Sequence, residues 1–77
     1  MHNPDLEIDA IGLLCPLPVL RARKALAGMK AGAVLRLLAD DPAAVIDVPH
    51  FCAQTGHAFI SATPDGPVTA YLVRRGP

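Results

Sequence analysis

The chain has 77 residues, with seven basic and seven acidic side chains, and 52% of its residues are hydrophobic while 18% are charged. A chain this short buries only about 60% of its extended surface on folding, so we expect residues 1–77 to form a single domain around one core. The balanced charge produces no overall field of the kind that attracts nucleic acid or an anionic membrane, so neither is expected as a direct partner.

No targeting or membrane-spanning segment is expected from the sequence. No apolar run approaches the roughly 20 residues of a transmembrane helix, and the first ten residues lack the basic-then-apolar pattern of a secretory signal. These features predict a cytoplasmic protein. Disulfides are rare in that reducing compartment, so Cys15 and Cys52 are expected to be free thiols.

The first half of the chain predicts a strand, a helix and a second strand. Alternating apolar and polar residues predict the first strand over residues 5–10, ending near Gly12. From Val19 onward, apolar residues recur every three or four positions, which predicts an amphipathic helix that closes near residues 28–32. The run at 33–39 is almost continuously apolar, which is typical of a strand buried on both faces.

Pro49 shapes the prediction for the next segment. A proline inside a helix costs about 3 kcal/mol, so one long regular helix is not expected here. We expect a short turn over residues 42–46, then a helix that is capped by Asp47, holds Pro49 in its first turn and ends at Gly56. This second helix should bury Phe51 and Cys52.

The last third of the chain predicts a β-hairpin. Residues 58–63 and 68–74 are both strand-like, and the sequence TPDGP between them has turn chemistry. The complete order is strand, helix, strand, helix, strand, strand. It predicts an α+β two-layer sandwich, βαβαββ, with two helices packed on one face of a four-stranded mixed sheet.

Cys15 lies in the connection between the first strand and the first helix, within the sequence GLLCPLPVL. Pro16 and Pro18 restrict the backbone on either side of Leu17, so the thiol is expected on a stiff loop. The nearby helix N-terminus favours a thiolate and predicts a lowered pKa for Cys15, although the two prolines have no N–H to hold an anion. The neighbouring residues are leucines, and no carboxylate is expected close to the thiol.

Several chemistries compete for Cys15. A thioredoxin-type dithiol is excluded because position 18 is proline, and a buried core thiol would need neither the two prolines that follow it nor a loop position. A protease nucleophile would need His50 or His57 as a base, but the chain is too small for a substrate cleft with an oriented triad. The histidines and cysteines show no paired metal-ligand spacing, so no metal is expected. Cys52 is interpreted as a core residue, with a resolving thiol as the alternative.

The charged residues near Cys15 divide by sign. All those of the first helix are basic, and we expect this helix to attract an acidic partner through Arg21, Arg23 and Lys24. Asp40 and Asp41 are most simply a helix cap, with contact to a partner as the alternative.

A series of different short motifs is distributed along nearly the whole chain: Asp9-Ala10, Gly12-Leu13, Cys15-Pro16-x-Pro18, Lys24, Ala39-Asp40-Asp41-Pro42, Asp47-Val48-Pro49-His50-Phe51-Cys52, Gly56-His57 and Tyr71-Leu72-Val73-Arg74-Arg75-Gly76. Together they resemble the TusA/SirA-like family of small sulfur carriers. The resemblance implies the same βαβαββ sandwich. It also implies that Cys15 accepts a sulfane sulfur as a persulfide from a cysteine desulfurase or a rhodanese-like donor and passes it to an acceptor protein.

Further site residues are expected around Cys15. Gly12, Pro16 and Pro18 are expected to support the motif, and Arg21, Arg23, Lys24, Asp40 and Asp41 are expected to bind partners. Neither a cofactor nor a metal is implied, and a monomer is expected. Leu14 and Leu17 stand where members used in tRNA thiolation often carry a basic and an acidic residue, so sulfur oxidation, cofactor biosynthesis and selenium handling stay open as pathways.

Two functions from other classes stay open. The fold also resembles the C-terminal domain of a bacterial translation initiation factor, which would make the chain an RNA-binding module; salt-dependent RNA binding that survives Cys15→Ser would favour it. The second open function is a regulatory protein-interaction module in which the cysteine is incidental. Loss of activity in a folded Cys15→Ser variant would exclude this function.

Overall fold

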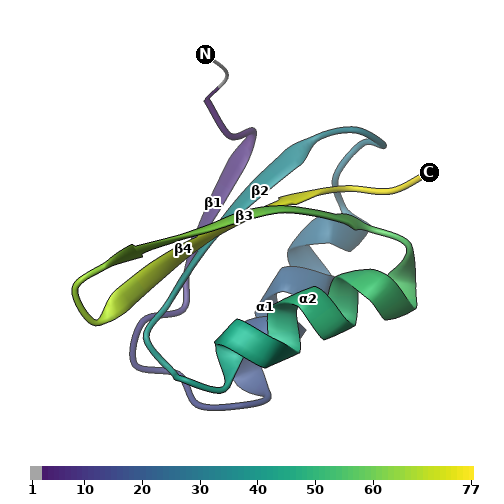
Figure 1. Ribbon diagram of the computed structural model, residues 1–77. Coiled ribbons are helices and arrows are strands. Elements are labelled where there is room, and N and C mark those ends of the chain that lie inside the picture. Colours follow the sequence, from purple (N-terminus) through teal and green to yellow (C-terminus); the bar gives the residue numbers. More distant parts are fainter. Residues whose placement is uncertain (1–2) are drawn as a thin grey trace.

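The computed structural model describes residues 3–77, and it confirms the predicted two-layer sandwich (Figure 1). Both helices cover the same face of the sheet, and the opposite face is open. The elements follow in the order β1 (Leu6–Asp9), α1 (Leu17–Ala27), β2 (Val34–Ala39), α2 (Ala44–Thr55), β3 (Ala58–Asp65) and β4 (Val68–Arg74).

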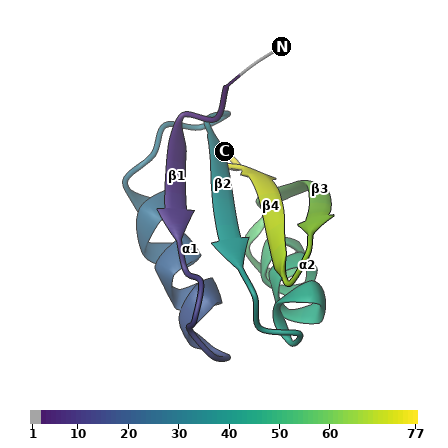
Figure 2. The same cartoon turned by 90° about the vertical axis from the view of Figure 1, so that its left-hand side faces the viewer.

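The sheet is mixed, with the strand order β1-β2-β4-β3 (Figure 2). β1 pairs in parallel with β2, and α1 forms the crossover that a parallel pair requires. β4 pairs antiparallel with both β2 and β3. A two-residue turn at 66–67 joins β3 to β4, so the predicted hairpin is confirmed. Across residues 3–77, no helix is long and apolar enough to cross a membrane.

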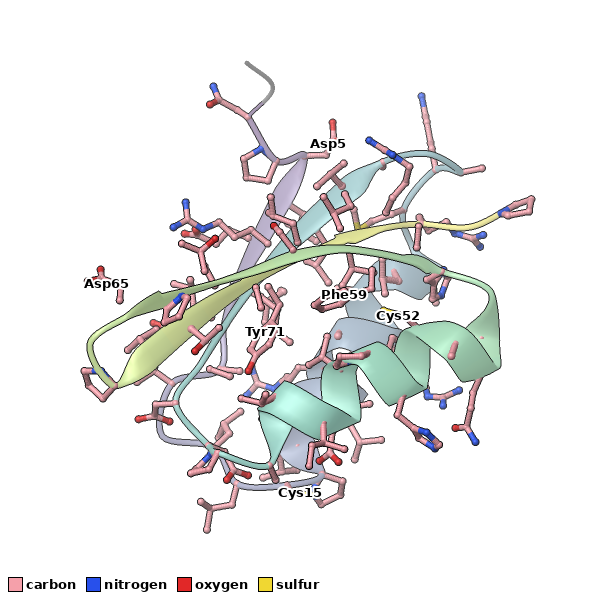
Figure 3. The ribbon with its side chains drawn as sticks, in the orientation of Figure 1. Asp5, Cys15, Cys52, Phe59, Asp65 and Tyr71 are labelled. Carbon is pink, nitrogen blue, oxygen red and sulfur yellow. The ribbon has the colours of Figure 1, made fainter. Side chains whose placement is uncertain are left out.

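The core lies between the sheet and the two helices and is largely aliphatic. Tyr71 on β4 and Cys52 on α2 lie in this layer (Figure 3). The buried side chains are Ala10, Ala22, Leu26, Leu35, Leu37, Ala39, Ala44, Val48, Phe51, Cys52, Tyr71 and Val73. Apart from Ala10, which directly follows β1, they come from both helices and from the helix-facing side of β2 and β4, so this one cluster holds the two layers together.

The structure corrects the prediction that β2 is buried on both faces. Leu35 and Leu37 face the helices and are fully buried, whereas Arg36 between them is exposed on the open face. Leu38 also lies on the open face and is half-buried. β2 is a central strand between β1 and β4, and its open face carries the charged Arg36 between the half-buried Val34 and Leu38.

The predicted break before Pro49 is wrong. α2 is one helix from Ala44, with Pro49 inside it, and Asp47 lies in its first turn rather than at its cap. The apolar face of this helix already includes Ala44 and Val48, which are buried against the sheet. Burial of these two side chains requires helix before the proline and offsets the cost of the missing N–H. The helix ends as predicted at Gly56, which has a left-handed φ of 79°.

α1 begins two residues earlier than predicted, at Leu17, with Pro16 as its N-cap residue. Pro18 therefore falls within the first turn, where a proline is tolerated because its N–H would have no helical partner. Its ring is buried, so Pro18 anchors the start of α1 in the core as well as restricting the backbone.

Candidate functional site

Cys15 lies in the loop from β1 to α1, next to the loop from β2 to α2, and two aspartates join these loops. The Gly12 N–H donates to Asp40 Oδ1 at 2.8 Å, and the Cys15 N–H donates to Asp41 Oδ2 at 2.6 Å. The other oxygen of Asp41 accepts the Ala43 N–H at 3.2 Å. The acidic pair therefore holds the backbone of this loop at Gly12 and at the cysteine itself.

This arrangement differs from the predicted helix cap. α2 has no side-chain cap, because both carboxylates bind the neighbouring loop or the turn before the helix. Gly12 makes the arrangement possible with a φ of 85°, a region that other residues rarely adopt. The partner-binding role of Asp40 and Asp41 stays a prediction, while their hydrogen bonds give them a structural role in the loop.

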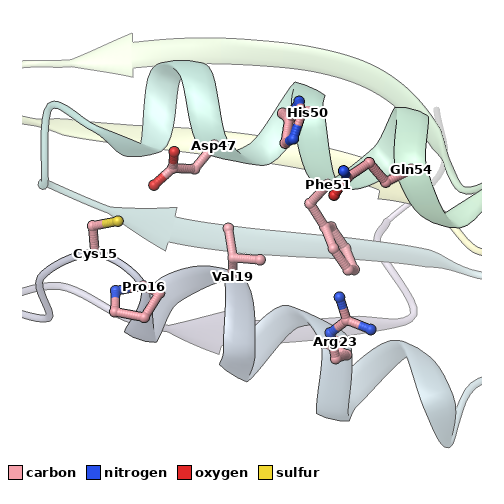
Figure 4. A pocket seen from close by; sticks show the side chains of 8 residues that line it. All are labelled: Cys15, Pro16, Val19, Arg23, Asp47, His50, Phe51 and Gln54. Carbon is pink, nitrogen blue, oxygen red and sulfur yellow. The ribbon is translucent and has the colours of Figure 1, made fainter.

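A groove of about 190 Å³ runs from Cys15 between α1 and α2 (Figure 4). The Cys15 thiol lies at one end and the Arg23 guanidinium at the other, with the Asp47 carboxylate facing the thiol from α2. The full lining is Cys15, Pro16, Val19, Arg23, Asp47, His50, Phe51 and Gln54. Cys15 itself is exposed, so its sulfur is accessible to another molecule.

The electrostatics of Cys15 are opposite to those predicted. A side-chain hydrogen bond with Asp47 is the main cause that raises the pKa of the thiol, and slight desolvation and the negative charges of Asp47 and Asp41 raise it further. The predicted lowering of this pKa is wrong, as is the expectation that no carboxylate lies near. At neutral pH, Cys15 is therefore held in its thiol form.

The helix N-terminus does little to oppose this shift. Pro16 and Pro18 have no N–H, and the Leu17 N–H already donates to the Leu14 carbonyl at 2.8 Å. The first turn of α1 thus offers few free donors toward the sulfur, whereas the carboxylate of Asp47 faces it directly. A full negative charge outweighs a partial positive end whose donors are missing or used.

The basic residues of α1 lie on two sides of the helix. The Arg23 guanidinium lies 5.3 Å from the centre of the Phe51 ring, inside the groove that contains Cys15. Arg21 and Lys24 instead line a separate hollow beside β1, with Leu6 among their neighbours. Only Arg23 therefore shares a surface with the thiol, and the partner-binding role of all three stays a prediction.

The second cysteine has the environment predicted for a core residue. Cys52 is 2% exposed, and burial raises its pKa. Both cysteines are free thiols. His57 is half-buried, and its Nδ1 accepts the Gly76 N–H at 2.9 Å. Within residues 3–77, no three potential metal-ligating side chains cluster.

Asp47 is the site residue that sequence reasoning missed. The sequence pattern predicts a helix cap at this position, and Asp47 comes from an element far along the chain from Cys15. Its place beside the thiol depends on how α2 packs next to α1, which no local spacing reveals. His50 and Gln54 join the groove for the same reason.

Alkylation should distinguish the two thiols. Iodoacetamide should modify Cys15 at least about tenfold faster than Cys52 near neutral pH, because a buried thiol reacts only when the structure opens. Since its pKa is raised, the rate at Cys15 should keep increasing above the pH at which an ordinary cysteine levels off. Peptide mapping by mass spectrometry across a pH series measures the alkylation rate of each cysteine and its pH dependence. Equal rates at the two cysteines, or a Cys15 rate that levels off at a lower pH than that of an ordinary cysteine, would contradict this description.

Comparison with known proteins identifies the family and supports the fold. The family model described as Sulfurtransferase TusA matches residues 6–75. The crystal structure of a SirA-like protein from Desulfitobacterium hafniense is similar with a TM-score of 0.81 and 31% sequence identity, covering 94% of this chain and 99% of that one. The match spans both layers of the sandwich and the Cys15 loop, so the chain belongs to the TusA sulfurtransferase family.

Proposed function

We propose that this protein carries sulfane sulfur as a persulfide on Cys15, taking it from a donor enzyme and passing it to an acceptor protein. Family membership supports a sulfur-carrier role in general. The observation that carries the proposal is the contrast between the two thiols: Cys15 is exposed at the end of a groove, whereas Cys52 is sealed in the core. A carrier needs one accessible sulfur and no nearby thiol that would discharge it as a disulfide.

The transfer needs no oxidant. The Cys15 thiol loses its proton and the thiolate attacks the outer sulfur of a donor persulfide. The sulfur–sulfur bond of the donor breaks, its electron pair leaves with the donor sulfur, and that thiolate takes up a proton. The same exchange in the opposite sense delivers the sulfur from Cys15 to an acceptor thiol.

Exposed apolar side chains on the Cys15 loop and on the first turns of α1 and α2 support a protein partner. Leu14 is 70% exposed and Ile46 is 74% exposed, on the two loops and helix starts that meet at the site. The whole group is Leu14, Leu17, Leu20, Val45 and Ile46. Clustered apolar surface of this kind is typical of a protein-binding site, so we infer that the donor and the acceptor dock here.

We infer a cysteine desulfurase or a rhodanese-like enzyme as the donor, in the cytoplasm, where thiols stay reduced. The acceptor belongs to tRNA thiolation, cofactor biosynthesis or sulfur oxidation. Which donor loads the protein would separate these routes.

The test is intact-protein mass spectrometry after incubation with a desulfurase and cysteine, or with a rhodanese and thiosulfate. One donor should add a single sulfur, about 32 Da, that dithiothreitol removes. Cys52→Ala is the matched control and should load like the wild type, because Cys52 is inaccessible. No adduct from either donor would overturn the proposal.

A further inference from the structure

The Asp47 carboxylate and the Cys15 sulfur face each other across the end of the groove (Figure 4). Among residues 3–77 the only ion pair joins Glu7 to Arg36, so no basic side chain neutralises Asp47 directly. The other titratable or charged groups at this site are Arg23 and His50, which line the groove on α1 and α2. Asp41, in the loop before α2, adds a second negative charge that acts on the same thiol.

These two carboxylates affect the empty and the loaded carrier differently. The Asp47 carboxylate faces the sulfur, so its negative charge stabilises the neutral thiol of the empty form relative to a thiolate. A persulfide is a stronger acid than a thiol and is largely an anion at neutral pH. Loading therefore places a negative sulfur beside Asp47 and Asp41, and like charges repel.

We propose that Asp47 biases Cys15 toward giving up sulfur, because its carboxylate stabilises the neutral thiol and destabilises the anionic persulfide. This inference rests on the proposed function and adds a residue that adjusts its direction. During release, the acceptor thiolate attacks the outer sulfur and the bond from that sulfur to Cys15 Sγ breaks. The electron pair stays on Cys15 Sγ, which takes the proton that the acceptor thiol lost, and the negative charge leaves with the new persulfide.

The test compares sulfur release by the wild type and Asp47→Asn, with glutathione as the acceptor. At equilibrium, mass spectrometry gives the ratio of loaded to empty protein, and Asp47→Asn should retain about two- to fivefold more sulfur, the range expected for one exposed charge pair. Asp47→Glu keeps the charge and should release sulfur like the wild type. Asp65→Asn is the matched control, since it removes the same charge from an exposed site at the far end of β3 (Figure 3).

Two further readouts keep the inference testable. Thiolate absorbance should show Cys15 of Asp47→Asn titrating at a lower pH than in the wild type, and this needs no sulfur donor. Raising the salt concentration should move the wild type itself toward the loaded form, because salt screens exposed charges. An Asp47→Asn protein with unchanged release and unchanged titration, or an Asp47→Glu protein that behaves like Asp47→Asn, would overturn the inference. Failure of the wild type to load would instead overturn the proposed function.

Discussion

Replacement of Cys15 by serine should abolish sulfur loading and leave the fold intact. A serine hydroxyl does not ionise near neutral pH and cannot form a persulfide. The other residues that line the groove carry no thiol, so none of them can replace Cys15. The side chain at position 15 is exposed, and its backbone N–H would still donate to Asp41. The thermal midpoint should therefore stay within about 4 °C of the wild-type value.

Loading and folding should be measured on the same preparation. Mass spectrometry after incubation with the active donor gives the sulfur content, and a circular-dichroism melt gives the midpoint. A folded Cys15→Ser protein that still gains one sulfur would move the site to Cys52. A protein that neither loads nor folds would show that Cys15 is structural, against its exposure.

Truncation of Leu37 should cause a large loss of stability. Leu37 is fully buried between the sheet and the helices, and it pairs across the sheet with Tyr71. Leu37→Ala should lower the free energy of unfolding by about 2–5 kcal/mol, a large part of the 5–15 kcal/mol typical of a small domain. Urea denaturation monitored by circular dichroism measures the change.

Leu38→Ala is the matched control, because Leu38 follows Leu37 on the same strand but faces the open side of the sheet and is half-buried. Its loss should be clearly smaller than that of Leu37→Ala. An equal loss at both positions would mean that the open face is covered in solution, for example by a second copy of the chain, and would contradict the one-sided core.

The order of elements could be predicted because it depends on local patterns. The alternation in β1, the helical spacing of Ala22 and Leu26, and the turn chemistry before β4 each need only a short window of sequence. The two-layer arrangement then follows, because each apolar face must be buried against another element. The start of α2 could not be predicted from local patterns, because burial of Ala44 and Val48 against the sheet outweighs the local cost of Pro49.

The candidate site was only half predictable. Cys15 and its prolines are contiguous in the sequence, so the reactive loop could be identified from the chain alone. The electrostatics around the Cys15 thiol could not be predicted from the chain alone, because Asp47 and Asp41 reach the cysteine from other parts of the fold. The sign of the pKa shift depends on these through-space contacts and on backbone donors that are missing or already used, and both are properties of the packed structure.

The most direct measurement is the amount of thiocyanate that cyanide releases from the protein after loading and removal of the donor. Cyanide takes only the transferable outer sulfur of a persulfide, so the assay counts sulfur that Cys15 can pass on. We predict about one thiocyanate per chain from the wild type and from Cys52→Ala, and none from Cys15→Ser. Absence of thiocyanate from the loaded wild type, or equal release from Cys15→Ser, would show that Cys15 does not carry sulfur.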